Sequence, residues 1–193
     1  VALSFRCLNV TPSGKEHRGV WIMANLLYGQ NKLDNSLSQK LFSEAGTGRE
    51  HENTTTAADL FSYTIPANTL EKGDIVRIKV FCTVVDSNGS DTLTPILNFG
   101  GTAIATGAAL DVADDDIVYA WADVHCTATG SSGTLTSIAE IRTDALGAVH
   151  VIATTALTSM DTTGGLAVAL NVDWDAAHAD NEVRIDAVSI ELV

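Results

Sequence analysis

The sequence contains no motif that is typical of a catalytic or nucleotide-binding site. It lacks a phosphate-binding loop ending in Lys-Ser/Thr, a G-x-G-x-x-G turn after a strand and a G-x-S-x-G nucleophile elbow. Its five histidines show neither the H-E-x-x-H pattern nor zinc-finger spacing. A carboxylate pair for glycoside hydrolysis stays an alternative, because the separation of the two groups is set by the fold. We therefore predict a protein that is not an enzyme and that has no catalytic, cofactor-binding or metal-binding residues.

One alternative to that prediction is a calcium site in the segment LDVADDDIV. This segment carries Asp111, Asp114, Asp115 and Asp116 within six residues of one another. Carboxylate oxygens in a loop are the ligands that Ca²⁺ prefers. Carboxylates are also typical of a solvated turn, and we favour this second interpretation.

A second acidic cluster lies in the segment DWDAAHAD. It contains Asp173, Asp175, His178 and Asp180, so carboxylates and an imidazole that could hold a divalent metal are close in sequence. The spacing matches no known metal-binding motif, and Asp180-Asn181 is typical of a turn. We expect a turn here and keep the metal site as the alternative.

Two aromatic residues, Tyr119 and Trp121, are two positions apart in the segment IVYAWA. In a strand they share one face. Exposed aromatic rings in such a row form a platform for sugar rings, whereas covered rings form a second core face or a subunit interface. Both faces of this segment are apolar, so we favour an interface and keep glycan binding as the alternative.

The three cysteines, Cys7, Cys82 and Cys126, cannot all pair within one chain. Cys82 and Cys126 lie in strand-like segments among apolar neighbours, which predicts buried free thiols in a reducing compartment. A disulfide between Cys82 and Cys126 on adjacent strands is the alternative. His125 and Cys126 do not form a ligand pair, because consecutive strand residues point to opposite faces.

The composition indicates a folded and strongly acidic protein. The chain has 193 residues, of which 46% are hydrophobic, and 24 Asp and Glu against 11 Lys and Arg give a net charge of −13. This charge argues against binding to nucleic-acid phosphates. No apolar run reaches the roughly 18 residues that span a bilayer, and the leading VALSFRCLNV does not resemble a signal peptide. We expect neither a nucleic acid nor a membrane as a partner.

Most of the chain shows the two-residue alternation of β-strands. The predicted strands are 59–65, 74–85, 92–99, 102–106, 117–128, 134–142, 148–157, 165–174 and 182–193. The buried faces expected for three long strands are Val76, Ile78, Val80, Cys82 and Val84, then Val118, Ala120, Ala122, Val124 and Cys126, and then Leu166, Val168, Leu170, Val172 and Trp174. The last strand carries two apolar faces, with Val183, Ile185 and Ala187 on one and Val188, Ile190 and Leu192 on the other.

Turn residues separate these strands at intervals of about 8–12 residues, with no long helical segment between them. This spacing predicts an all-β fold and an antiparallel sandwich. Eight or so strands in this length of chain fit a jelly roll best.

Composition and charge change near residue 53. Residues 1–50 have a net charge of +2, whereas residues 51–193 have a net charge of −15. We therefore divide the chain into an extended N-terminal arm, residues 1–53, and a jelly-roll domain, residues 54–193. The arm is too poor in core residues to fold alone, although short helices are possible at 21–29 and 36–44. Met23 begins a segment typical of a protein N-terminus, so it is an alternative start residue.

Three segments resemble a jelly-roll domain of structural proteins in tailed bacteriophages. LFSYTIPANTLEKGDIVRIKVFCTV (60–84) resembles the first two strands of that domain, with the Ile-Pro-Ala-Asn-Thr-Leu connection and a Gly-Asp turn. LTPILNFGGTAIAT (93–106) resembles the next strand with its double glycine, and NEVRIDAVSIELV (181–193) resembles the last strand. The resemblance covers roughly residues 56–193.

The resemblance implies a virion structural protein, most simply a capsid decoration (cement) protein assembled in the host cytoplasm. Its partner would be the major capsid protein or another virion protein, and its own state a homotrimer. The arm residues expected to meet that partner are Arg18, Val20, Trp21, Ile22, Leu26, Leu27, Tyr28, Lys32 and Lys40. The alternative function is a receptor- or glycan-binding fibre or tail module with the same fold, which would use Tyr119 and Trp121.

Overall fold

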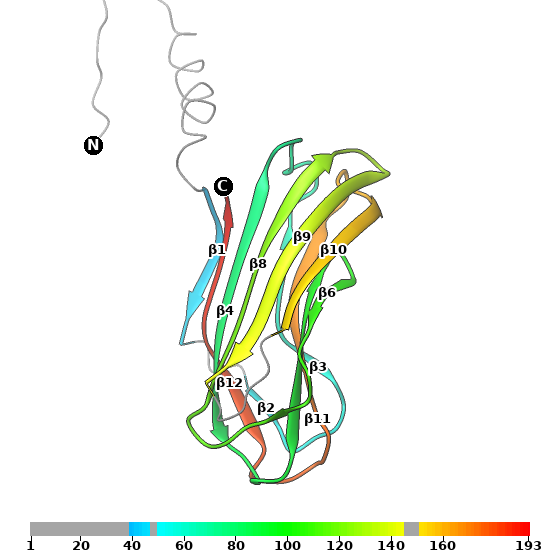
Figure 1. Cartoon of the computed structure of the whole chain (residues 1–193). Coiled ribbons are helices and arrows are strands. Elements are labelled where there is room, and N and C mark those ends of the chain that lie inside the picture. Colours follow the sequence, from blue (N-terminus) through cyan, green and yellow to red (C-terminus); the bar gives the residue numbers. More distant parts are fainter. Residues whose placement is uncertain (1–38, 47–49, 145–150) are drawn as a thin grey trace, which may run out of the picture. The chain divides into compact units, whose positions relative to one another are not determined.

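The computed structural model describes residues 39–46, 50–144 and 151–193, and these residues form an all-β unit (Figure 1). Neither an α-helix nor a membrane-spanning helix occurs among them. The strands are β1 (Gln39–Ala45), β2 (Glu50–Glu52), β3 (Ala58–Ile65), β4 (Ile75–Asp86), β5 (Thr92–Phe99), β6 (Thr102–Thr106), β7 (Leu110–Asp111), β8 (Ile117–Ala128), β9 (Gly133–Thr143), β10 (Val151–Met160), β11 (Leu166–Trp174) and β12 (Glu182–Leu192).

The strands form two antiparallel sheets that face each other as a sandwich (Figure 1). The seven-stranded sheet has the order β1-β12-β4-β8-β9-β10, with β2 also paired to β12, and the five-stranded sheet has the order β3-β11-β5-β6, with β7 paired to β5. Strands that are consecutive in the chain, such as β3, β4 and β5, alternate between the sheets. This order is that of a jelly roll whose larger sheet is extended by β9 and β10. The predicted fold class is confirmed.

The buried faces predicted for three long strands are confirmed. Every second residue of β4, β8 and β11 is buried, in the phase that the sequence indicated. The two inner faces meet in one core, whose largest fully buried side chains include Trp174, Phe61 and Phe99. Because each of these strands must bury one face, the opposite side chains of β4 and β8 are directed to the outside of the larger sheet.

A β-bulge explains the two apolar faces of the last strand. Ile185 pairs with Cys82 and Ala187 pairs with Phe81, so Asp186 is an extra residue without a partner across the ladder. The extra residue reverses the alternation, and both Ile185 and Val188 are therefore buried. The expectation of two opposite apolar faces on this strand is wrong, because Val183 and Ile185 before the bulge and Val188 and Ile190 after it enter the same core.

The sandwich starts earlier than the boundary predicted near residue 53. β1 and β2 both pair with β12, so residues 39–45 and 50–52 contribute strands that complete this side of the jelly roll. Phe42 anchors this segment, with its ring centroid 5.4 Å from that of Phe61 and 4.9 Å from that of Tyr63. The helix considered at 36–44 is also wrong for its described part, because residues 39–44 are strand.

The disulfide considered between Cys82 and Cys126 is absent, and both thiols are free and buried. Cys82 pairs with Val118 of β8, and Cys126 lies eight residues further along the same strand. At about 3.3 Å per residue that distance is roughly 26 Å, far beyond the reach of a disulfide. Burial raises the pKa of the Cys82 thiol far above its ordinary value, so the group stays protonated.

The position of β1 and β2 leads to a prediction about chain length. A chain that begins at residue 54 should be at least about 3 kcal/mol less stable than one that begins at residue 38, because it loses the ladder to β12 and the Phe42 ring contacts. Urea unfolding followed by circular dichroism measures the difference. Equal stability of the two chains would show that the sandwich does not need residues 38–53.

Candidate functional site

The outer face of the seven-stranded sheet carries a row of aromatic rings. Tyr119 and Trp121 both point outward from β8, and Phe81 of β4 pairs with Tyr119 across the ladder. The Phe81 and Tyr119 ring centroids are 4.6 Å apart with a tilt of 40°, a favourable arrangement for two aromatic rings. We call Phe81, Tyr119 and Trp121 the aromatic strip.

Strand pairing surrounds the aromatic strip with charged side chains. Arg77 donates two hydrogen bonds to Asp123, from Nε to Oδ1 at 2.9 Å and from Nη2 to Oδ2 at 3.0 Å. Trp121 donates from Nε1 to Oε2 of Glu140 at 2.5 Å. These contacts hold the flanking side chains in defined positions.

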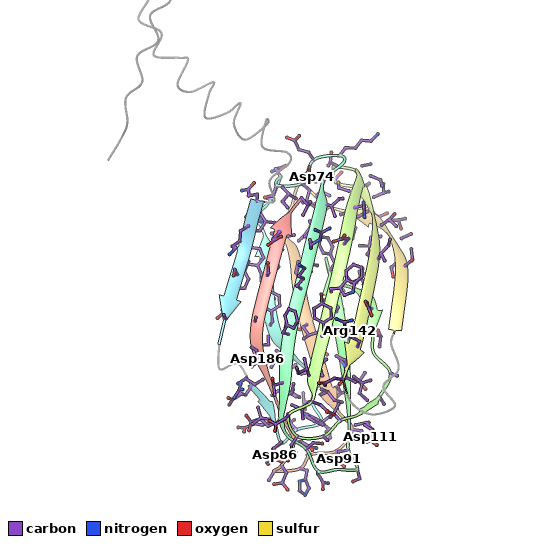
Figure 2. All side chains as sticks on the ribbon, turned by 60° about the vertical axis from the view of Figure 1, so that its left-hand side comes forward. Asp74, Asp86, Asp91, Asp111, Arg142 and Asp186 are labelled. Atoms are coloured by element: carbon purple, nitrogen blue, oxygen red, sulfur yellow. The ribbon has the colours of Figure 1, made fainter. Side chains whose placement is uncertain are left out.

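Arg142 of β9 also borders the aromatic strip. We call the charged residues Arg77, Asp123, Glu140 and Arg142 the frame of the strip. Its guanidinium carbon is 4.7 Å from the centre of the Tyr119 ring, a cation–π contact. Figure 2 shows Arg142 on the outer face of the sheet, near the end of β9. Burial raises the pKa of Tyr119, and the nearby Arg142 charge partly opposes that shift, so the phenol keeps its proton at neutral pH.

The same face exposes large apolar side chains. Phe81 is 40%, Ile117 45% and Ile138 42% exposed, and these are three of the four large hydrophobic residues exposed in the described part of the chain. All three project from the strands that carry the aromatic strip or its frame. An apolar area of this kind, bordered by polar groups, is typical of a binding surface.

Sequence reasoning found Tyr119 and Trp121 but missed their neighbours. Phe81, Glu140 and Arg142 join them only through the registers of β4 with β8 and of β8 with β9. The alternation of 74–85 placed Phe81 on the outer face, and this was the available signal. Among the predicted arm residues, Lys40 lies in edge strand β1 and is exposed, and the others lie outside the described residues.

Several acidic side chains gather at one end of the sandwich, where Figure 2 shows Asp86, Asp91 and Asp111, whereas Asp74 lies at the other end. Some members of the two predicted clusters fasten loops. Asp114 Oδ1 accepts from the Ser87 backbone N at 2.8 Å, and Asp175 Oδ1 accepts from the Thr92 backbone N at 2.7 Å. No group of three or more metal-ligating side chains suited to an ion occurs among the described residues. In the described loops, these carboxylates act as turn-forming groups.

Asn181 connects the loops at this end and is fully buried. Its Nδ2 donates to Asp91 Oδ2 at 2.8 Å and to the Ala176 carbonyl at 3.0 Å, and its Oδ1 accepts from the Asn88 backbone N at 3.1 Å. Its own carbonyl accepts from the Asn53 backbone N at 3.0 Å. Hydrogen bonds from Asn181, and then from Asn88, lower the pKa of Asp91.

His51 of β2 is a second buried polar residue near this end, only 6% exposed. Its Nε2 makes no hydrogen bond with any described residue. Burial lowers the pKa of His51 below the ordinary value of 6.5, and the charge of Asp173 partly opposes that shift. The folded protein therefore favours the neutral imidazole.

No family model matches the chain. No curated protein matches it either. Among solved structures, the C-terminal domain of EclA, described as a sugar-binding protein, is 12% identical with a TM-score of 0.35 over 94% of this chain and 88% of that chain. The CBM2 module of the evolved Dit of Lactobacillus casei BL23 phage J-1 is 11% identical with a TM-score of 0.27 over 67% of each chain. These scores lie below the level of a common fold, so neither similarity carries an argument about function.

Replacing Asn181 should weaken the loop end. We expect Asn181→Ala to lower the free energy of unfolding by about 2–3 kcal/mol, because its buried partners lose their hydrogen bonds. Asn171→Ala is the control, since the Asn171 side chain makes a single exposed contact of 3.5 Å with Asp59, and it should change stability by less than about 0.5 kcal/mol. Chemical denaturation measures both, and equal midpoints for the two variants would contradict the proposed role.

Acidification should destabilise the fold through His51. The pKa of His51 is lowered in the folded state, so the unfolded chain takes up its proton first and stability falls as the pH drops below 6.5. The His51→Gln variant should show a flatter dependence of melting temperature between about pH 7.5 and about pH 5.5. The control is His125→Gln, which removes an imidazole from the outer face of β8 and should keep a steeper slope than His51→Gln. An unchanged slope in His51→Gln would refute this assignment.

Proposed function

We propose that this chain is a non-enzymatic carbohydrate-binding module of a bacteriophage particle, and that it binds sugar on the outer face of the seven-stranded sheet. The observation that carries the proposal is the aromatic strip, in which Tyr119 and Trp121 stand side by side within a frame of hydrogen-bonding side chains. Sugar rings present an apolar C–H face and a polar rim, and this surface offers partners for both.

Each part of the surface has a role in this proposal. The Trp121 and Tyr119 rings stack against the C–H faces of sugar rings, while Asp123 and Glu140 accept hydrogen bonds from hydroxyl groups. The ring contact with Phe81 and the hydrogen bond to Glu140 already fix the aromatic side chains. Binding therefore costs little side-chain entropy.

The placement on a virion is supported by the resemblance of residues 60–84 to phage structural proteins. The capsid decoration role is a second candidate, favoured by the exposed Ile117 and Ile138, which suit a protein interface. In that case the face would meet the major capsid protein, another virion protein or further copies in a homotrimer. The partner-binding arm of that proposal, Arg18 to Lys32, lies outside the described residues.

Binding to a glycan array tests the main proposal. Trp121→Ala should lower the affinity for any bound glycan about tenfold or more, which corresponds to roughly 1.4 kcal/mol of lost stacking. Ile96→Ala removes an apolar side chain from the outer face of the other sheet and should bind as the wild type does. Thermal melts confirm that both variants are folded.

Two results would overturn the proposal. One is a wild-type protein that binds no glycan on the array, and the other is a Trp121→Ala variant with unchanged affinity. If capsids stripped of the protein also lose heat resistance and regain it on its return, the decoration role is the better account.

A further inference from the structure

Basic side chains are concentrated at the aromatic strip. The described residues contain Lys40, Lys72, Arg77, Lys79, Arg142 and Arg184 as their Lys and Arg residues. Half of these, Arg77, Lys79 and Arg142, project from the outer face of β4 and β9 beside the strip. Such a concentration is unexpected in a chain with a net charge of −13.

Lys79 is the cation best placed to meet a ligand. It pairs with Trp121 across the β4–β8 ladder, so the two residues are neighbours on the outer face. It is exposed and makes no ion pair or hydrogen bond with any described residue. The neighbouring Arg77 differs, because Asp123 already occupies its guanidinium. A free ammonium group on the same face as a stacking ring is suited to an anion carried by the stacked molecule.

Arg142 provides a second cation on the other side of the strip. It lies on β9 beside Tyr119, whereas Lys79 lies on β4 beside Trp121. The two cations therefore flank neighbouring rings from opposite sides. A chain of sugar units that follows the strip meets one cation on each side of its path.

The charge of the rest of the molecule also favours the binding of an anion at this face and not elsewhere. Acidic residues dominate the loop end of the sandwich, where they repel anions within the screening length of about 8–10 Å. On the sheet face, the acidic Asp123, Glu140, Asp186 and Glu191 are matched in number by the basic Arg77, Lys79, Arg142 and Arg184. An anionic polymer can therefore approach this face without the repulsion that it meets at the loop end.

From these positions we infer that the ligand is an anionic polysaccharide, whose carboxylate or phosphate groups pair with Lys79 and Arg142 while its sugar rings stack on Trp121 and Tyr119. The inference rests on the proposed carbohydrate-binding function and adds the charge of the ligand. It predicts salt-sensitive binding, since exposed ion pairs are screened.

Matched polymers test the inference on the full chain. The probes are polygalacturonate, its uncharged methyl ester and a phosphomannan, with affinities measured by calorimetry at about 50 mM and about 300 mM NaCl. We expect at least one anionic polymer to bind, and to bind more weakly at the higher salt concentration. If polygalacturonate is the polymer that binds, its methyl ester should bind at least about fivefold more weakly. Preference between the two anionic polymers identifies carboxylate or phosphate as the recognised group.

Charge-removing variants locate the contact. Lys79→Gln and Arg142→Gln should each lower the affinity for the anionic polymer about threefold to fivefold and reduce its salt dependence. Lys72→Gln, in the exposed loop before β4, removes the same charge away from the strip and should bind as the wild type does. Melting temperatures show whether each variant keeps its fold.

The outcomes separate the inference from the proposed function. One outcome would overturn the anionic ligand and keep the carbohydrate-binding function. In that outcome, binding does not depend on salt, Lys79→Gln and Arg142→Gln leave the affinity unchanged, and Trp121→Ala still lowers it. Failure of both anionic polymers to bind would also overturn the inference. If no glycan of any charge binds, both are wrong.

Discussion

The two-residue alternation of the central strands β4 and β8 is the constraint on which the rest of this molecule depends. Each strand lies in the middle of the seven-stranded sheet and must bury one face against the other sheet. With Val118, Ala120 and Ala122 committed to the core, Tyr119 and Trp121 have no direction left but outward. The aromatic strip is therefore a direct consequence of the phase in which β8 enters the sheet, and a shift of one residue would bury it.

Strand register turns that outward face into a surface with defined chemistry. Arg77 and Asp123 are 46 residues apart in the chain, yet antiparallel pairing places them opposite each other and allows a two-point ion pair. The same pairing brings Glu140 to the Trp121 indole and Arg142 to the Tyr119 ring. Cross-strand neighbours restrict the motion of each ring, and this makes the face ordered before any ligand arrives.

The acidic character of the chain has a different role at the loop end. There the carboxylates of Asp91, Asp114 and Asp175 accept hydrogen bonds from loop groups, and the buried Asn181 ties the loops together. Such contacts offset the loss of backbone solvation where strands end. The remaining negative charge at this end and the balanced charge on the sheet face divide the surface into regions with different preferences for anions.

Local pattern alone determined the all-β class, most strand positions and the buried faces of β4, β8 and β11, because alternation is written in consecutive residues. It also identified Tyr119 and Trp121 as neighbours on one face. Tertiary structure decided the rest. The bulge at Asp186 reversed the phase of β12, and pairing with β12 drew β1 and β2 into the sandwich. Strand register brought Phe81, Glu140 and Arg142 next to Tyr119 and Trp121. These features depend on hydrogen bonds between strands distant in sequence, and no window of consecutive residues contains that information.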